Sequence, residues 1–190
     1  MFMQKGNFII KYDKKDEEDI SKIDFERIFS EVAGFFGYKG KTVIKIYLIN
    51  SVEEYCFFSN QKFERWMCAF TSINNTIFVF SPRVIEAFTS HKKEEFPGII
   101  KHELSHLMYY HSGLSRSGIF DEGIASFLKG NTVNNNDNIY NYGNMLVRSI
   151  INDYGKARLI AFLRKTKNIT KEKIASNFPS INIKKYEKYL

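Results

Sequence analysis

The sequence predicts an α+β fold in which a small mixed β-sheet packs against helices. Strand-like segments precede Pro82, whereas helical periodicity dominates after it, and this order is typical of α+β domains. The sequence contains no internal repeat, so nothing indicates a repeat architecture. With 190 residues, the chain is about the length of one domain and can bury a core without disulfides. We therefore expect a single domain over residues 1–190, with a basic helical tail over about 156–190.

The part of the chain before Pro82 contains the expected strands and two expected helices. β-branched and aromatic residues bounded by turn residues indicate the strands. Apolar residues at helical spacing predict the first helix, which should stop at Gly37. Ser51, with Glu54 three residues later, is a capping box that should open the second. The expected strands are 8–12, 42–49, 66–70 and 76–80, and the expected helices are 20–36 and 52–58.

Helices make up the expected structure beyond Pro82. Pro97 suits the first turn of one helix, while Gly113 and Gly130 suit the ends of two. The Asn-rich stretch 131–138 predicts a surface loop. The expected helices are 84–88, 97–112, 121–129, 139–154 and 156–166.

Charge is concentrated at the C-terminal end of the sequence. Residues 156–190 carry 10 of the 28 Lys and Arg residues, but only Glu172 and Glu187 among the acidic ones. Such a block could meet an acidic surface or nucleic acid. Because no nucleic-acid-binding motif accompanies it, we interpret it as a solvated helical tail and expect no nucleic-acid partner.

Targeting and redox features are few. No apolar run is long enough to span a bilayer, and no secretory signal opens the chain. We therefore expect a cytoplasmic protein without membrane insertion. Cys56 and Cys68 have neither a disulfide framework nor metal-type spacing, so we expect buried free thiols. Oligomeric state is left open.

The chemistry is concentrated in His102-Glu103-Leu104-Ser105-His106, within the expected helix 97–112. Two histidines four apart lie about 40° apart around a helix axis, so they can hold one ion between them. Glu103 lies beside them, where it can take a proton from a water on that ion. Apolar residues on the opposite side should face the core, so the histidine side can line a cleft. Ile99 and Tyr110 are expected on that cleft side as well.

A third ligand follows in the next expected helix. A metzincin-type site would need histidine at 112, where this chain has Ser112, and His111 is one residue out of register. Glu122, in Phe120-Asp121-Glu122-Gly123-Ile124-Ala125, is the better candidate. Gly123 is small enough for a close approach to the histidine helix, and three protein ligands leave one position open, as catalytic zinc requires.

These residues resemble the gluzincin metallopeptidases, whose ligands are two motif histidines and a glutamate on the next helix. The likeness is to the peptidase MA-like domains and to the catalytic core of aminopeptidase-type gluzincins, which share the Glu-Gly-x-Ala pattern at Glu122 to Ala125. It covers roughly residues 8–163 and implies a zincin-like metallopeptidase domain with one Zn²⁺ per chain.

The resemblance also implies roles for individual residues. His102, His106 and Glu122 would bind zinc, and Glu103 would activate the zinc-bound water as general base and later donate the proton. Aminopeptidase-type gluzincins stabilise the transition state with a tyrosine in Tyr-x-Lys-Gly. Here the match is Tyr140-Asn141-Tyr142-Gly143, so Tyr140 is the candidate and Tyr142 the reserve.

The expected substrate is a peptide or protein, cut internally. The amino-terminal grip of aminopeptidases is missing, and no Asp or Glu lies between Glu64 and Glu86. Strand 76–80, with Ile77, Phe78 and Val79, could then bind a peptide along a sheet edge. Two alternatives remain: an intracellular site-specific protease of a regulatory protein, or a catalytically inert metal-containing domain that binds peptides.

Overall fold

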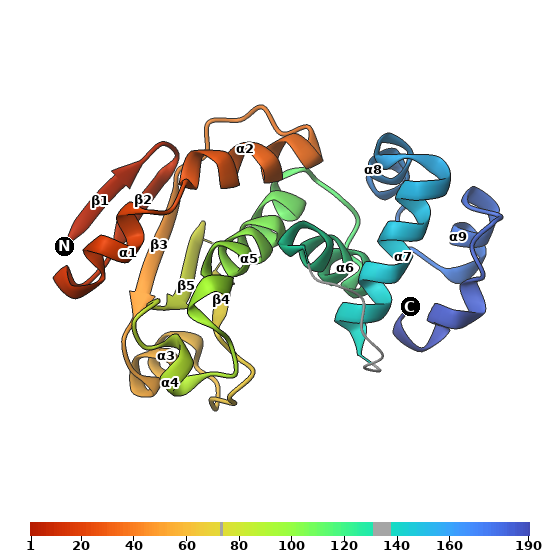
Figure 1. The fold of residues 1–190 in the computed structure, drawn as a ribbon. Coiled ribbons are helices and arrows are strands. Elements are labelled where there is room, and N and C mark those ends of the chain that lie inside the picture. The colour runs from red at the N-terminus through yellow and green to blue at the C-terminus, as the bar shows by residue number, and fades with distance from the viewer. Residues whose placement is uncertain (73, 131–137) are drawn as a thin grey trace. The chain divides into compact units, whose positions relative to one another are not determined.

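The computed structural model describes residues 1–72, 74–130 and 138–190, drawn in Figure 1. Within these residues the chain forms two compact units. The first comprises Met1–Ala33 and Lys39–Leu107, and the second Gly34–Tyr38 and Met108–Leu190. The predicted α+β class is confirmed, because a mixed sheet lies in the first part of the chain and helices form most of the second.

The first unit is built on a five-stranded sheet with the order β1-β2-β3-β5-β4. Its strands are β1 (Phe2–Lys5), β2 (Phe8–Lys11), β3 (Ile44–Ile49), β4 (Ala69–Ser72) and β5 (Thr76–Phe80). The three central strands β2, β3 and β5 are parallel, and each outer strand pairs antiparallel with its neighbour. The edges of the sheet are therefore β1 and β4.

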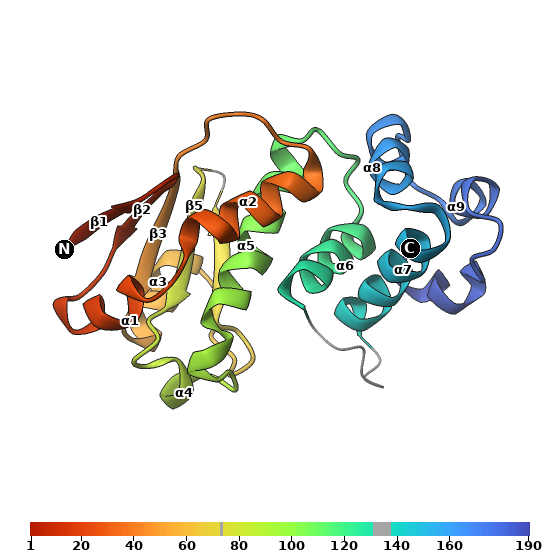
Figure 2. The ribbon, with the colours of Figure 1, turned by 45° about the horizontal axis from the view of Figure 1, so that its top comes forward.

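The inner face of this sheet carries the core of the first unit. Figures 1 and 2 show α2 (Phe25–Phe36) and α5 (Phe96–His111) on this face. The Phe8 ring lies 5.4 Å from that of Phe25 and 6.0 Å from that of Phe29, which joins β2 to α2. Alternate strand residues bury this face almost completely: Phe8, Ile10, Ile44, Ile46, Leu48, Ile77 and Val79.

The outer face is covered by α3 (Val52–Ser59) at the β3–β5 side. Phe58 packs on Tyr47 and Phe78, with ring centroids 4.8 and 4.9 Å apart. The predicted cap is present, because the Ser51 hydroxyl accepts from the Glu54 N–H. The Glu54 carboxylate accepts from the Asn50 N–H, one residue earlier than a capping box requires. The unit also contains η1 (Lys14–Asp16), α1 (Glu17–Ser21), α4 (Ile85–Phe88) and η2 (Lys93–Glu95).

Two sequence predictions for this unit need correction, and one strand was missed. The helix expected over 20–36 is interrupted, because the Asp24 carboxylate caps a new helix by accepting from the Arg27 N–H. The strand expected over 66–70 begins only at Ala69, after a turn closed by the Met67 N–H and the Glu64 carbonyl. β1 was not predicted, since its four residues become a strand only by pairing with β2. Both cysteines are free, as expected, but only partly buried.

The second unit is helical. Beside the end of α5 it contains α6 (Gly118–Lys129), α7 (Ile139–Tyr154), α8 (Lys156–Lys165), α9 (Lys171–Asn177) and η3 (Ile183–Tyr189). α6 ends at Gly130, as predicted, with a left-handed φ of 87°. The predicted Asn-rich loop lies, apart from Asn138, outside the described residues. No helix in the described ranges has the length and apolar character needed to cross a bilayer.

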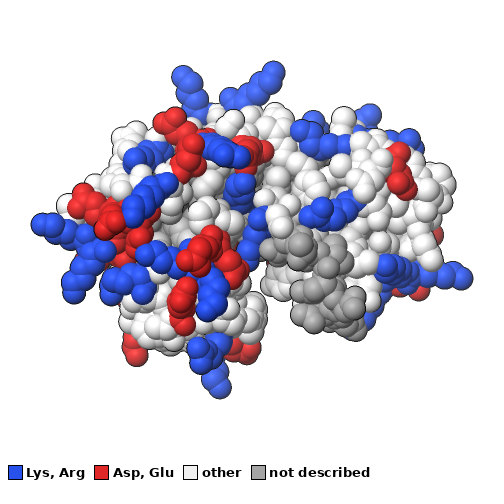
Figure 3. All heavy atoms as spheres, in the orientation of Figure 1, with Lys and Arg blue, Asp and Glu red and all other residues white. Residues whose placement is uncertain are grey.

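The basic segment beyond residue 155 is helical and forms part of the core of this unit. Phe162 and Phe178 are buried with their rings 5.0 Å apart, and Ser115 N–H donates to the Leu163 carbonyl. Arg158 lies over the Tyr154 ring, 4.8 Å from its centroid. On the face drawn in Figure 3, acidic and basic side chains intermix over the first unit, and basic ones predominate over the C-terminal helices. Only the polar side of the segment is solvated.

α6 and α7 approach each other through two glycines. A Cβ on Gly123 would lie 2.5 Å from the Gly143 carbonyl, and a Cβ on Gly143 would lie 2.5 Å from the Ile119 carbonyl. These distances leave no room for any side chain. The close approach expected of Gly123 is therefore made to α7, whose Gly143 supplies its three nearest atoms.

Replacing Gly143 with alanine should force the two helices apart. We expect Gly143→Ala to lower the free energy of unfolding by about 1–3 kcal/mol, as overpacking does in other cores. The matched control is Gly34→Ala in α2, where an added Cβ meets nothing within 4 Å. It should be neutral or stabilising by up to about 1 kcal/mol. Urea denaturation followed by circular dichroism measures both, and equal stabilities would contradict the close packing.

Candidate metal site

α5 presents one fully buried side and one polar side. The apolar stripe predicted to face the core does so, since Ile100, Leu104 and Met108 have no exposed surface. Ile99, expected on the cleft side, is buried as well, whereas Tyr110 is exposed. The helix begins at Phe96 and ends at His111, within one residue of the prediction. Because a turn of helix separates the two motif histidines, burial of the opposite side determines where they point.

His102 and His106 turn their Nε2 atoms towards each other. These two atoms are 3.2 Å apart, and the ring centroids are 4.8 Å apart with an interplanar angle of 84°. Two imidazoles bound to one tetrahedral zinc at about 2.0–2.1 Å need nitrogens about 3.3 Å apart. The two rings therefore already have the separation that a shared ion requires.

Glu122, on α6, completes the group. Ligand atoms of His102, His106 and Glu122 all lie within 4.8 Å of one another, and all three residues are partly buried. Across the described ranges this is the one group of three His, Cys, Asp or Glu side chains close enough to hold a metal ion. The expectation that these residues can hold a metal together is confirmed. The identity of the metal remains a prediction.

Glu103 is buried, with 8% of its surface exposed. It lies next to His102 on the same helix, as the motif requires. A buried carboxylate is costly unless a charged or polar group compensates it, so such residues are concentrated at functional sites. Glu103 lies beside the histidines because it follows His102 on the helix, and it need not be a metal ligand itself.

Contacts near the two ends of α5 hold the helix in place. The Lys101 ammonium pairs with Glu31 of α2, and this pairing, together with Arg27, lowers the pKa of the Glu31 carboxyl. Near the other end, the Tyr109 hydroxyl donates to the Ser115 carbonyl at 2.6 Å. Burial raises the pKa of Tyr109 strongly, and the charge of Asp121 raises it further, so this tyrosine is a neutral anchor.

The two candidate tyrosines of α7 have different surroundings. Tyr142 packs against the C-terminal segment, its ring 5.0 Å from that of Tyr189 and 6.3 Å from that of Tyr186. These ring contacts give Tyr142 a structural role. Tyr140 is half-buried in the first turn of α7.

β5 is not the edge strand that the sequence suggested. It pairs with β3 on one side and with β4 on the other, so Ile77, Phe78 and Val79 cannot pair with an added peptide. Ile77 and Val79 are also completely buried. The edge on this side is β4, which sequence reasoning missed as a binding element. Its one available signal is that Ala69, Thr71 and Ser72 are smaller and more polar than the residues of β5.

Comparison of the sequence with models of known protein families and with curated proteins gave no match.

Removing a ligand should remove the metal. We expect His102→Ala and Glu122→Ala to reduce bound zinc from about one per chain to below about a tenth, because two protein ligands bind zinc far more weakly than three. His111→Ala is the matched control, since His111 lies on the same helix outside the group. Elemental analysis of each purified variant measures the ratio. Full zinc in either ligand variant would show that the ligand set is wrong.

Proposed function

We propose that the chain is a zinc-dependent peptidase that cuts peptide bonds internally. The observation that carries this proposal is the His102, His106 and Glu122 group, with the buried Glu103 on the same helix. Structural zinc sites usually have four protein ligands, whereas catalytic sites have three and keep a position for water. The described residues supply three, which supports a catalytic site.

Zinc is the metal that suits this donor set. Two imidazoles and one carboxylate are typical of catalytic zinc, while Mg²⁺ and Ca²⁺ prefer oxygen ligands alone. A bound zinc lowers the pKa of water to about 7 and polarises the scissile carbonyl.

Glu103 would handle the protons. Its carboxylate would accept a proton from the attacking water and later donate it to the leaving nitrogen. The same residue would therefore take up and return the proton. The burial of Glu103 favours this role, because a low local dielectric strengthens its interaction with the proton in transit. Tyr140 would donate a hydrogen bond to the oxyanion of the transition state, a contribution typically worth about 2.7–4 kcal/mol.

The free edge of β4 would hold the substrate in an extended conformation. Phe80 N–H donates to the Cys68 carbonyl, so Cys68 and Phe80 form a hydrogen-bonded pair. Hydrogen-bonded and non-hydrogen-bonded pairs alternate along an antiparallel ladder, which makes Ala69–Val79 and Thr71–Ile77 non-hydrogen-bonded pairs. The backbone groups of Ala69 and Thr71 therefore point away from β5, towards the open edge. A substrate strand pairing there needs no free amino terminus, which favours internal cleavage.

The general base can be tested without changing the fold. We expect Glu103→Gln to lower the hydrolysis rate by at least about a hundredfold, because the amide cannot accept the proton of water. Its zinc content should equal that of the parent. Glu94→Gln, an exposed change shortly before α5, is the matched control. A Glu103→Gln variant as fast as the parent would make Glu103 structural, and zinc-loaded protein inert towards every peptide would favour a binding domain.

The substrate path can be tested at Thr71. Thr71→Pro removes one outward N–H of an edge strand, where proline is tolerated. We expect kcat/KM for an N-acetylated peptide to fall about tenfold, as a lost hydrogen bond of about 1.4 kcal/mol implies, with zinc unchanged. Thr71→Val keeps the N–H and should keep the activity. Mass spectrometry of the digest should show internal cleavage by the parent, and stepwise trimming from the amino end would identify an exopeptidase instead.

A further inference from the structure

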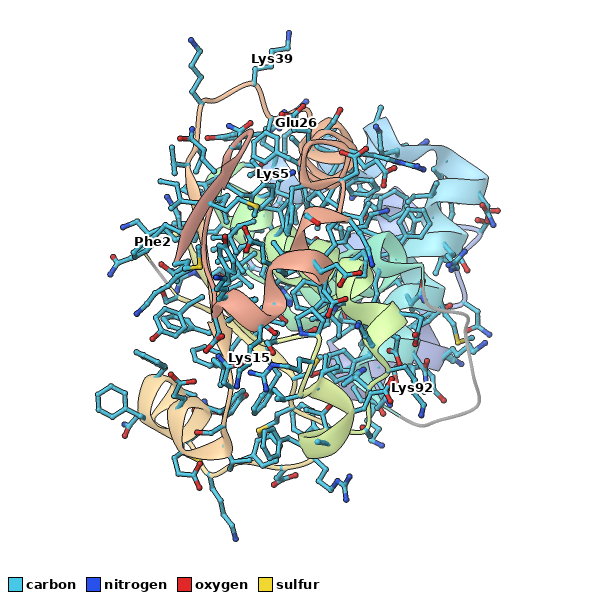
Figure 4. The ribbon with its side chains drawn as sticks, turned by 60° about the vertical axis from the view of Figure 1, so that its left-hand side comes forward. Phe2, Lys5, Lys15, Glu26, Lys39 and Lys92 are labelled. Carbon is cyan, nitrogen blue, oxygen red and sulfur yellow. The ribbon has the colours of Figure 1, made fainter. Side chains whose placement is uncertain are left out.

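The outer face of the sheet is only partly covered. Strand register places one row of side chains across this face: Phe2 beside Lys11, Lys11 beside Tyr47, Tyr47 beside Phe78 and Phe78 beside Phe70. α3 covers the Tyr47 and Phe78 part of the row through Phe58. Nothing among the described residues provides a matching helix over β1 and β2. In Figure 4, Phe2 lies on the side of β1 away from α2, whereas Lys5 lies towards it.

Apolar side chains remain exposed on this uncovered part. The exposed fractions are 72% for Phe2 in β1, 37% for Ile9 in β2 and 51% for Val43 just before β3. Phe57 on the neighbouring α3 is 80% exposed. Strands of all-parallel sheets are usually covered on both faces. Ile9 lies on β2, which is parallel to β3 and antiparallel to β1, and its outer face is not covered. The pattern indicates a surface that is completed by a partner.

The uncovered strip has the width of one helix. α3 lies over the boundary between β3 and β5, because Phe58 contacts one residue of each. Packed helices lie about 8–10 Å apart, and neighbouring strands about 4.8 Å. A second helix beside α3 would therefore lie about two strands away, over the boundary between β1 and β2, where Phe2 and Ile9 point outwards.

The charge of the strip is positive. Lys11 and Lys45 are its charged side chains, and the described outward-facing residues of β1, β2 and β3 include no carboxylate. Lys11 is held in place by Tyr47, with its Nζ donating to the hydroxyl at 3.0 Å. Beside α3 the strip deepens into a cavity of about 370 Å³, lined by Lys11, Lys14 and Tyr47 and also by the carboxylates of Asp13 and Glu54. The Glu54 carboxylate there is already bonded to the Asn50 N–H at 2.7 Å.

A second copy of this chain is a poor occupant of the strip. A symmetric dimer places the same patch on both sides of the interface, so Lys11 and Lys45 of both copies would meet. Like charges brought together in this way cost several kcal/mol. The occupant needs apolar residues for Phe2 and Ile9 and carboxylates for the two lysines.

We propose that the outer face of β1 and β2 binds an acidic amphipathic helix of a partner protein, which lies beside α3 and completes the second layer over the sheet. Its apolar stripe would cover Phe2, Ile9 and Phe57. Its flanking carboxylates would pair with Lys11 and Lys45. This surface is separate from the open edge of β4, so it adds a partner to the chain without using the groups that we assign to hydrolysis.

The test uses two labelled synthetic helices of about 18 residues, long enough for about five turns. Both carry leucines at i, i+3, i+4 and i+7 spacing, with glutamates in one and lysines in the other at the remaining positions. Fluorescence anisotropy measures binding to the Glu103→Gln protein, in which hydrolysis of the peptide is suppressed. We expect the glutamate helix to bind and the lysine helix not to bind. The double change Lys11→Glu and Lys45→Glu should weaken the glutamate helix at least about tenfold and let the lysine helix bind.

Two further variants separate surface from fold. Ile9→Asp should weaken the glutamate helix to a similar extent while leaving the circular dichroism spectrum unchanged. The charge-matched control, Lys92→Glu with Lys184→Glu, changes exposed residues outside the strip and should alter binding by less than about twofold. Equal binding of both helices, or of neither, would overturn the proposal. Binding to phosphatidylserine vesicles that Lys11→Glu and Lys45→Glu abolish, without peptide binding, would identify a lipid surface instead.

Discussion

The burial of one side of α5 is the constraint on which the candidate site depends. Ile100, Leu104 and Met108 lie one turn apart and have no exposed surface, so the helix cannot rotate without exposing them. Since α5 belongs to the first unit up to Leu107 and to the second beyond it, its buried stripe contributes to both cores. The histidines occupy the opposite side as a geometric consequence. A core made of ordinary aliphatic residues thereby determines the positions of the polar groups.

The second constraint is the contact between α6 and α7. Gly123 follows Glu122 directly, and its backbone lies against that of Gly143, so any side chain there would displace the helix that carries the third ligand. Small residues at a helix crossing restrict the position of the backbone more tightly than larger residues, which can repack. This backbone contact fixes the spacing between α7 and α6, the helix that carries Glu122.

The sheet is covered on its inner face, but part of its outer face and its two edge strands are open. Its inner face is buried over β2, β3 and β5, and these central strands are paired on both sides, so peptides can be added only at β1 or β4. The outer face is closed over β3 and β5 by Phe58 and open over β1 and β2. The two proposals use different parts of this asymmetry: a substrate strand at the β4 edge, and a partner helix on the face of β1 and β2.

The sequence by itself determined α4, α5, α6, α7 and α8 to within about three residues at each end, the α+β class, and the histidine spacing on α5. It predicted α9 and η3 only as part of a helical tail. Helical periodicity, Gly130 as a stop and the Ser51 cap are local signals, so they can be read without knowing what packs against them. Only the tertiary structure decided that β5 is internal, that β1 is a strand and that Gly123 meets Gly143. It alone also brought Glu122 to the two histidines. Each of these depends on contacts between residues far apart in the chain, and no local pattern specifies which partners will meet.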